Sequence, residues 1–134
     1  MKSVVEFLEK NPVNYFSTVG IDGAPKVRPF QFMFEKGGKL FYCTSNQKDV
    51  YKQMEKNPRV EICVTGADSS WIRVSGKAVF VKDAEVKKMI LDKNEMIRAI
   101  YGSPDNPVFE VFYLADVKAV ISDFSGNPPQ VFTF

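Results

Sequence analysis

Phe41-Tyr42-Cys43-Thr44-Ser45-Asn46-Gln47-Lys48 is the stretch of sequence on which the expected fold and site depend. An apolar strand ends here in a loop of hydroxyl and amide side chains, and Lys48 stands where the next helix is expected to begin. Free backbone N–H groups at a helix start, short hydroxyls and a cation can together bind a phosphate monoester. Arg28, on an earlier predicted strand, adds a planar fork of donors that suits phosphate. The alternative is an ordinary polar turn and helix cap, because short phosphate-like loops also occur in proteins that bind no phosphate.

Length, charge and composition narrow the possible classes of protein. The 134 residues suggest one domain, 1–134, with enough chain for a hydrophobic core. A net charge of +2 gives no basic field for a nucleic acid, and no apolar run is long enough to span a membrane. The segment Met1–Glu6 lacks the apolar core of a signal peptide. Cys43 and Cys63 lie in apolar strand patterns, which predicts buried free thiols and a cytoplasmic location. Together with the charge and the hydropathy, this predicts neither nucleic-acid nor membrane partners.

The absence of histidine excludes several kinds of catalytic and metal site. There can be no Ser-His-Asp triad, no Cys-His nucleophile and no histidine ligand for zinc or haem. Two cysteines alone are a poor basis for a zinc site, so no metal is expected. No pair of carboxylates suits acid–base catalysis, and Asp83, Asp92 and Asp116 are interpreted as cap or turn residues. We therefore predict no catalytic side chain; an enzyme of this sequence would take its chemistry from a cofactor.

Hydrophobic periodicity and turn residues predict a mainly β domain with peripheral helices. The predicted strands are Val13–Val19, Lys26–Phe34, Lys39–Thr44, Val60–Thr65, Trp71–Val81 and Val108–Ser122, the last bent near Asp116. Four helices are predicted. The first begins with a capping box at Ser3-Val4-Val5-Glu6, and the second, from about Gln47 to Lys56, is capped by Asn46. The third is capped by Asp83, and the fourth begins at about Glu95. Met89 and Met96 are expected to fill the core, and the apolar tail 123–134 is expected to dock on the domain.

The number and even spacing of the strands favour a closed antiparallel barrel. Strand Lys26–Phe34 is apolar on both faces, with Phe30, Phe32 and Phe34 on one side and Val27, Pro29 and Met33 on the other. Only one face of a barrel strand can point inside. A partner subunit is the simplest cover for the other face, which predicts a homodimer.

Five features occur in a characteristic order over residues 12–82. They are Pro25-Lys26-Val27-Arg28, Phe41-Tyr42-Cys43-Thr44, Lys48, Asn57-Pro58-Arg59-Val60 and Val74-Ser75-Gly76-Lys77-Ala78. In this combination the chain resembles the pyridoxamine 5′-phosphate oxidase-like family of FMN-binding split barrels. Its compact length and its Asp123-Phe124-Ser125-Gly126 segment are more similar to the small nitroimidazole-resistance-type subgroup. The resemblance implies a six-stranded antiparallel Greek-key split β-barrel and a homodimer with FMN bound at the subunit interface.

The same resemblance implies the cofactor-binding residues. Arg28 and Lys48 match the family's phosphate-binding cations, and Thr44, Ser45 and Asn46 match the loop around the phosphate. Pro29, Phe30 and Gln31 match the strand whose backbone lies beside the isoalloxazine ring, with Tyr42 and Cys43 on the adjoining strand. Trp71 has two interpretations that do not come from the family: it faces the flavin of the partner chain, or it anchors the interface without touching the cofactor.

The chain also departs from the family pattern. Pyridoxamine 5′-phosphate oxidase itself has a C-terminal substrate segment that is missing here, and the nitroimidazole-resistance and haem-degrading members often use a histidine. The resemblance therefore predicts the fold and the cofactor but names no substrate. We expect an FMN-dependent oxidoreductase of an unidentified small molecule, with NAD(P)H as a candidate electron donor. The alternatives are a non-catalytic flavin or nucleotide carrier or sensor, and a split barrel that binds a deazaflavin or haem.

Overall fold

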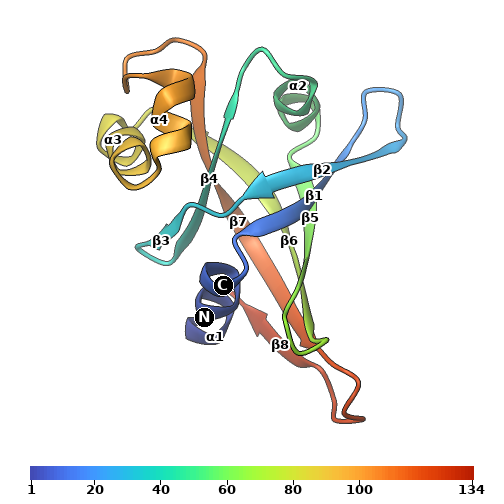
Figure 1. Cartoon of the computed structure of the whole chain (residues 1–134). Helices are drawn as coiled ribbons and strands as arrows, with labels where there is room; N and C mark the ends of the chain where they lie inside the picture. Colours follow the sequence, from blue (N-terminus) through green and yellow to red (C-terminus); the bar gives the residue numbers. More distant parts are fainter.

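One antiparallel sheet organises the chain in the computed structural model, which describes residues 1–134. Its eight strands are β1 (Val13–Val19), β2 (Pro25–Gln31), β3 (Phe34–Lys36), β4 (Lys39–Ser45), β5 (Arg59–Thr65), β6 (Trp71–Val81), β7 (Phe109–Ser122) and β8 (Gln130–Thr133). The strand order is β2-β1-β5-β6-β7-β4-β3, and β8 pairs with β7. The long strand β7 crosses the whole molecule (Figure 1). One of its edges pairs with β6, while its other edge pairs first with β4 and then with β8.

The two ends of this strand order meet at Phe32 and Met33. The Phe32 N–H donates to the Pro12 carbonyl, 2.8 Å away, and the Met33 N–H donates to the Phe41 carbonyl, 3.1 Å away. Two consecutive residues thus join the β1 side of the sheet to β4, and the sheet closes into a barrel. The predicted class, a mainly β antiparallel barrel, is confirmed. The predicted strand Lys26–Phe34 is wrong at its end, because the chain changes partner there and divides into β2 and β3; with β8, eight strands replace the predicted six.

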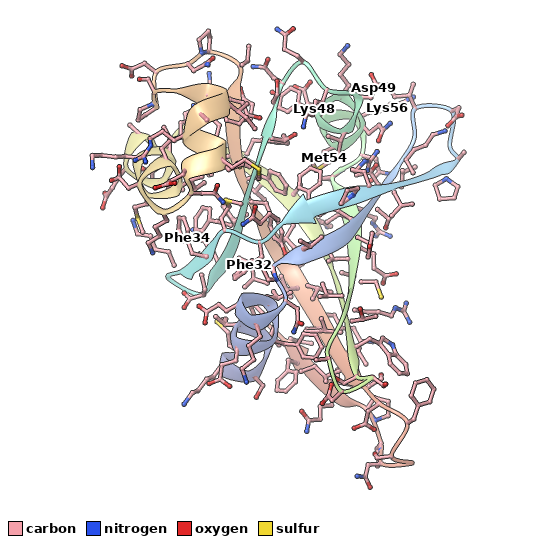
Figure 2. The ribbon with its side chains drawn as sticks, in the orientation of Figure 1. Phe32, Phe34, Lys48, Asp49, Met54 and Lys56 are labelled. Atoms are coloured by element: carbon pink, nitrogen blue, oxygen red, sulfur yellow. The ribbon has the colours of Figure 1, made fainter.

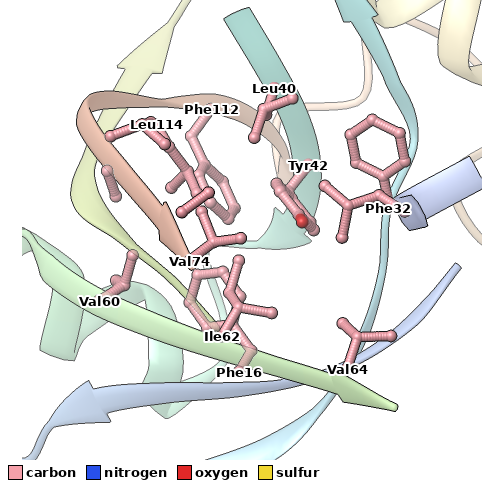
Figure 3. Close-up of a cluster of buried hydrophobic side chains, with 14 of the residues drawn as sticks. Phe16, Phe32, Leu40, Tyr42, Val60, Ile62, Val64, Val74, Phe112 and Leu114 are labelled. Atoms are coloured by element: carbon pink, nitrogen blue, oxygen red, sulfur yellow. The ribbon is translucent and has the colours of Figure 1, made fainter. Parts of the chain in front are cut away.

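The barrel interior is filled by side chains that alternate along the strands. Figure 3 shows aromatic residues of three strands, Phe16, Tyr42 and Phe112, meeting there. Their ring centroids lie 5.7 Å apart for Phe16 and Tyr42 and 5.8 Å apart for each of the other two pairs. On β5, Val60, Ile62 and Val64 all point inward, as their alternation predicts. The strand order and the inward alternation therefore both place the main hydrophobic core inside the barrel.

The four helices pack on the outside of this barrel (Figure 1). They are α1 (Lys2–Lys10), α2 (Asp49–Lys56), α3 (Ala84–Lys93) and α4 (Glu95–Tyr101). A second apolar cluster, which includes Phe34, Ile90 and Phe109, binds α3 and α4 to the sheet. None of the helices is long and apolar enough to cross a bilayer.

The helix starts agree only in part with the caps expected from the sequence. Asp83 caps α3 as predicted, since its carboxylate accepts from the Glu85 and Val86 N–H groups. The capping box at Ser3 is wrong: α1 already begins at Lys2 and has no side-chain cap. This helix is held by tertiary packing instead, because it buries Val4 and Leu8 completely.

The C-terminal part confirms the predicted bend and the docked tail. Asp116 has φ 52°, and the pairing of β6 with β7 shifts register opposite it, between Ser75 and Lys77. Beyond the turn, β8 pairs with β7, and Phe134 and Val117 exchange two backbone hydrogen bonds of 2.8 and 3.0 Å. The tail is therefore an integral strand of the sheet.

Candidate functional site

Most of the predicted cofactor residues gather around one cleft of about 310 Å³. Strands β2 and β4 form one part of its lining, and helix α4 forms the other. Six predicted residues line it: Pro29, Phe30, Gln31, Cys43, Thr44 and Lys48. Another hollow, of about 590 Å³ over β1, β5 and β6, contains none of the predicted residues. The cleft beside α4 is therefore the candidate site.

Thr44 contributes the most informative atom of the cleft. Its side chain is only 3% exposed, and Oγ1 is the one buried side-chain polar atom in the structure without a hydrogen-bond partner. An unpaired buried hydroxyl costs about 1–3 kcal/mol. Native proteins satisfy nearly all such atoms, so an exception next to a cleft points to a ligand that supplies the missing bond.

Lys48 lies directly before α2, which begins at Asp49 (Figure 2). Its extended backbone, φ −87° and ψ 151°, makes it the residue that precedes the helix. It lines the cleft and takes part in none of the six ion pairs. The cleft therefore has one uncompensated cation beside the first free N–H groups of a helix, the arrangement that attracts an anion.

The loop between Thr44 and Lys48 differs from the predicted one. Asn46 does not cap α2, because its amide donates to the Pro107 carbonyl at 2.8 Å and to the Glu110 carboxylate at 2.9 Å. Ser45 Oγ accepts from the Gln47 N–H at 3.2 Å, a short local turn. The Asn46 amide thus ties the loop to the start of β7, and neither Ser45 nor Asn46 lines the cleft.

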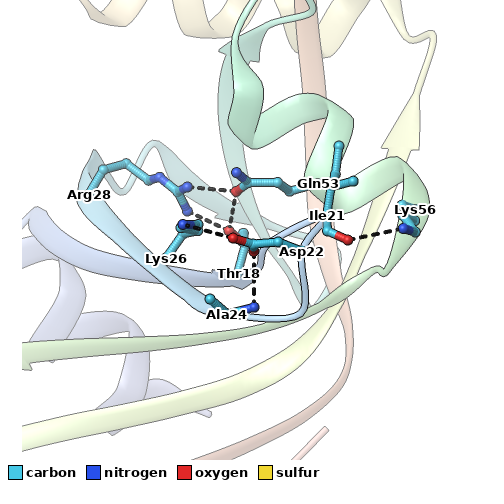
Figure 4. A network of polar contacts seen from close by, with 8 residues as sticks. All are labelled: Thr18, Ile21, Asp22, Ala24, Lys26, Arg28, Gln53 and Lys56. Carbon is cyan, nitrogen blue, oxygen red and sulfur yellow. Dashed lines mark hydrogen bonds and ion pairs between the residues drawn. The ribbon is translucent and has the colours of Figure 1, made fainter.

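Arg28 does not line the cleft but points toward α2 (Figure 4). Its guanidinium donates to Thr18 Oγ1 and to Gln53 Oε1, each at 2.7 Å, and Thr18 donates to the same Gln53 oxygen at 2.6 Å. Burial lowers the Arg28 pKa and the Asp49 carboxylate opposes this effect, so the guanidinium also lies near the first turn of α2. Its role as a phosphate ligand stays a prediction.

The tyrosine and cysteine side chains near the cleft are protonated at neutral pH. Tyr42 points into the core, where its hydroxyl donates to Asn14 Oδ1 at 2.5 Å and burial raises its pKa. Burial raises the pKa of the Cys43 thiol, which lines the cleft, to about 12. Burial also raises the pKa of Tyr101 to about 12. Cys43 is thus a thiol without nucleophilic character, since the thiolate is the reactive form.

Trp71 lies outside this cleft. It starts β6 opposite Ser122, at the end of the sheet where β7 turns toward β8, and its ring packs against Phe124 with centroids 5.2 Å apart. Within one chain it is not among the residues that line the cleft. Both of its predicted roles require a second chain and stay predictions.

Helix α4 supplies cleft residues that the sequence did not single out. Met96 is 61% exposed and Ile100 63% exposed, and both line the cleft with Ile97 and Tyr101. The expectation that Met96 fills the core is wrong, although Met89 does pack against the second cluster. A signal was present: α4 has seven residues and is apolar around most of its circumference, whereas a surface helix can bury only one face.

An exposed apolar surface begins at the cleft and continues over the outside of the barrel. Cross-strand pairs bring Tyr15 beside Pro29 and Cys63, while Val13 and Val27 extend the surface on either side. This surface, which we call the outer β1–β2 face, shares Val13 and Pro29 with the cleft. The expected burial of Cys63 is wrong, because Cys63 points outward from β5 and is exposed.

Comparison with known proteins gives a family and a group of related structures. The model of the pyridoxamine 5′-phosphate oxidase family matches residues 1–119. A NimC/NimA family protein from Clostridium acetobutylicum is 34% identical, with 100% of this chain and 93% of that chain covered and a TM-score of 0.90. A pyridoxamine 5′-phosphate oxidase-related FMN-binding protein from Nostoc punctiforme is 14% identical over 99% and 95% of the two chains, with a TM-score of 0.67. No curated protein sequence matches this chain.

Proteins with other ligands share the fold. A haem-binding protein from Mycobacterium smegmatis is 19% identical, covering 95% of this chain and 55% of its own, with a TM-score of 0.71. An F420 reductase is 21% identical over 82% and 90% of the two chains, with a TM-score of 0.63. At these identities the likeness concerns the fold alone.

Proposed function

Because the chain belongs to the pyridoxamine 5′-phosphate oxidase family, we propose that it binds FMN in the cleft beside α4 and acts as a flavin-dependent oxidoreductase on a small molecule. When bound, the flavin accepts a hydride or electrons at its own ring, so the protein has to bind, orient and shield it. Such a role suits a cleft in which Cys43 and Tyr101 both keep their protons at neutral pH.

The observation that carries this proposal is the pair formed by Thr44 and Lys48. A buried hydroxyl without a partner and a cation without a carboxylate line the same cleft, four residues apart on either side of the β4–α2 loop. A phosphate monoester supplies what both lack, since its oxygens accept from the hydroxyl, the ammonium and the backbone N–H groups of α2. The residues present therefore fit the phosphate end of FMN.

The neighbouring strand fits the other end of the cofactor. β2 is the first strand in the sheet order, so one of its edges has no strand partner. Because the Phe32 N–H donates to Pro12, alternation along β2 pairs Phe30 with β1 and turns the backbone of Pro29 and Gln31 to the free edge. The Pro29 carbonyl and the Gln31 N–H and carbonyl, beside the cleft, can then meet the polar edge of a flavin ring. Arg28 is the proposed second phosphate ligand; its guanidinium would exchange the Gln53 contact for the phosphate.

The proposed assembly is a homodimer in which the outer β1–β2 face is covered by a second copy. The face is apolar and exposed in the single chain, and it shares Val13 and Pro29 with the cleft. A partner seated there would also shield the cofactor, and Trp71 of the partner could then approach the ring. Cytoplasmic location agrees with the two free cysteines.

Two alternatives make different use of the same cleft. A deazaflavin such as F420 also has a fused ring and a phosphate, so the same residues could hold it. Haem has weaker support, because the chain contains no histidine and the Cys43 thiol resists ionisation. A passive flavin carrier would bind FMN but would not transfer electrons to a substrate.

The test is the identity and redox behaviour of the bound cofactor. We expect the purified or reconstituted protein to release FMN on heating, identified by chromatography and mass, and the bound flavin to bleach with NADH or NADPH. Recovery of FAD, F420 or haem, or no flavin after reconstitution, would contradict FMN as the cofactor. Bound FMN that neither NADH nor NADPH reduces, and that passes no electrons to an added acceptor after chemical reduction, would identify a passive binder.

A further inference from the structure

The α4 side of the cleft has a chemistry that differs from the Thr44 and Lys48 side. Met96 and Ile100 are one helical turn apart and are exposed toward the cleft, with Met33 and Ile97 completing an apolar wall. Exposed apolar side chains gain free energy when a ligand covers them. Lys48 is the only charged residue among the twelve that line the cleft. The wall therefore offers nothing that would compensate a second charge.

One polar group interrupts this wall. The Tyr101 side chain lines the cleft, and the residue's only hydrogen bond to a side chain is made by the backbone carbonyl, which accepts from the Asn106 amide; the hydroxyl makes none within the protein. The Cys43 thiol of β4 lines the same cleft. The ring stacks on Phe109 with centroids 4.5 Å apart, which fixes its orientation. Tyr101 thus presents a neutral, positioned donor in apolar surroundings.

We propose that the α4 side of the cleft binds an uncharged apolar substrate with one acceptor oxygen, which the Tyr101 hydroxyl holds against Met96 and Ile100. This inference rests on the proposed function, in which the FMN phosphate occupies the Lys48 end. A small number of positioned polar groups in an apolar lining is the usual basis of ligand orientation. A charged analogue would lose its hydration against the wall without gaining a partner, and it would be rejected.

Binding of three small aromatic probes to the FMN-loaded protein tests the proposal. Acetophenone has the ring and the acceptor oxygen, ethylbenzene lacks the oxygen, and 4-acetylbenzoate adds a negative charge. In NMR titrations of the isotope-labelled protein, we expect acetophenone to bind at least tenfold more tightly than 4-acetylbenzoate and to shift α4 amides. Tyr101→Phe keeps the stacked ring and should weaken acetophenone about fivefold to tenfold, to the level of ethylbenzene, whose binding should not change.

A substitution in the wall tests the apolar contact with the substrate. Met96→Asp should weaken acetophenone at least tenfold, measured on protein saturated with FMN. Ile21→Asp is the matched control: Ile21 is 57% exposed, apolar and outside the cleft, and its replacement should affect neither ligand. Unchanged acetophenone binding to Met96→Asp, or equal binding of the neutral and charged probes, would overturn the proposal. If the parent protein binds FMN but prefers no probe, this inference alone fails; if it binds no FMN, the proposed function fails first.

Discussion

Arg28 on β2 and Gln53 on α2 are joined by a hydrogen bond of 2.7 Å, and Thr18 donates to the same Gln53 oxygen from β1. One amide oxygen thus connects two strands to α2, the helix that follows Lys48. Gln53 and Thr18 are both buried, so the network lies where bulk water cannot replace its bonds. The position of the α2 start relative to β2 therefore depends on a guanidinium that is itself a candidate phosphate ligand.

The first prediction concerns this network in the absence of any ligand. Arg28→Ala removes the charged donor from Thr18 and Gln53, and we expect the free energy of unfolding to fall by about 1–2 kcal/mol. Denaturant unfolding of the apo-protein measures this loss. Lys26→Ala is the control, because Lys26 lies on the same strand and forms only an exposed ion pair with Asp22. It should change stability by less than about 0.5 kcal/mol. Equal effects of the two substitutions would contradict the role of the network.

The second prediction separates phosphate binding from ring binding. Lys48→Ala should lower the affinity for FMN about tenfold to a hundredfold, since it removes a charge-assisted bond to the phosphate, and should leave riboflavin unchanged. Arg28→Ala should have the same selectivity with a smaller effect, because the guanidinium has to leave Gln53 to reach the phosphate. Fluorescence titration of both ligands into the apo variants is the measurement. A loss that is equal for FMN and riboflavin would show that these cations act on the ring or the fold.

The third prediction concerns the assembly. We expect light scattering to show a dimer at micromolar concentration, with an interface of about 2,000 Å² or more. Val27→Asp places a charge on the outer β1–β2 face and should yield a monomer with weakened FMN binding. Val131→Asp changes an equally apolar, exposed residue on β8 and should leave the dimer intact. A parent protein that is monomeric and retains its cofactor would contradict the proposed homodimer.

The fourth prediction is a loss of stability at alkaline pH. Burial raises the pKa of Cys43 from an ordinary 9.0 to about 12, and burial also raises that of Tyr42. Above about pH 9 the unfolded chain loses the thiol proton while the folded chain keeps it, so the contribution is full below pH 9 and is lost as pH rises toward 12. Each buried group steepens the decline by at most about 1.4 kcal/mol per pH unit.

Urea unfolding between pH 8 and pH 11 tests this dependence. Cys43→Ala should flatten part of the decline, because the alanine has no proton to release. Cys63→Ala should not, since Cys63 is exposed in the folded chain as in the unfolded chain. Identical slopes for the two variants would show that Cys43 does not carry the effect.

The sequence predicted those elements that are governed by local rules. Alternation on β5 and β6 identified the inward side chains, and Asp83 was found as a cap because it precedes an apolar helix with its carboxylate free. Asn46 has the same local signature, but in the fold its amide donates to Pro107 and Glu110, more than sixty residues away. No local sequence pattern contains those partners. A tertiary hydrogen bond can therefore replace the helix cap that a side chain would otherwise form.

The candidate site was predictable where one strand runs into one loop, and not where separate elements meet. Thr44 and Lys48 are only four positions apart in sequence, so the strand-to-helix turn predicted that they line the same site. Met96 could not be assigned to that cleft, because its position depends on how α4 packs against β4. Trp71 shows the opposite case: its side chain was singled out by type, but the fold places it opposite Ser122 at the start of β6, outside the cleft.

The change of partner at Phe32 and Met33 also affects how the protein moves. Seven residue pairs hold β1 to β2, whereas two hydrogen bonds close the barrel at this point. We expect these two amides to exchange with solvent together, through a local opening that is less costly than global unfolding. Gln31 and Met33 border the cleft on either side of this closure. A ligand that contacts both residues would then slow this local opening, and hydrogen exchange at Phe32 and Met33 would report its binding.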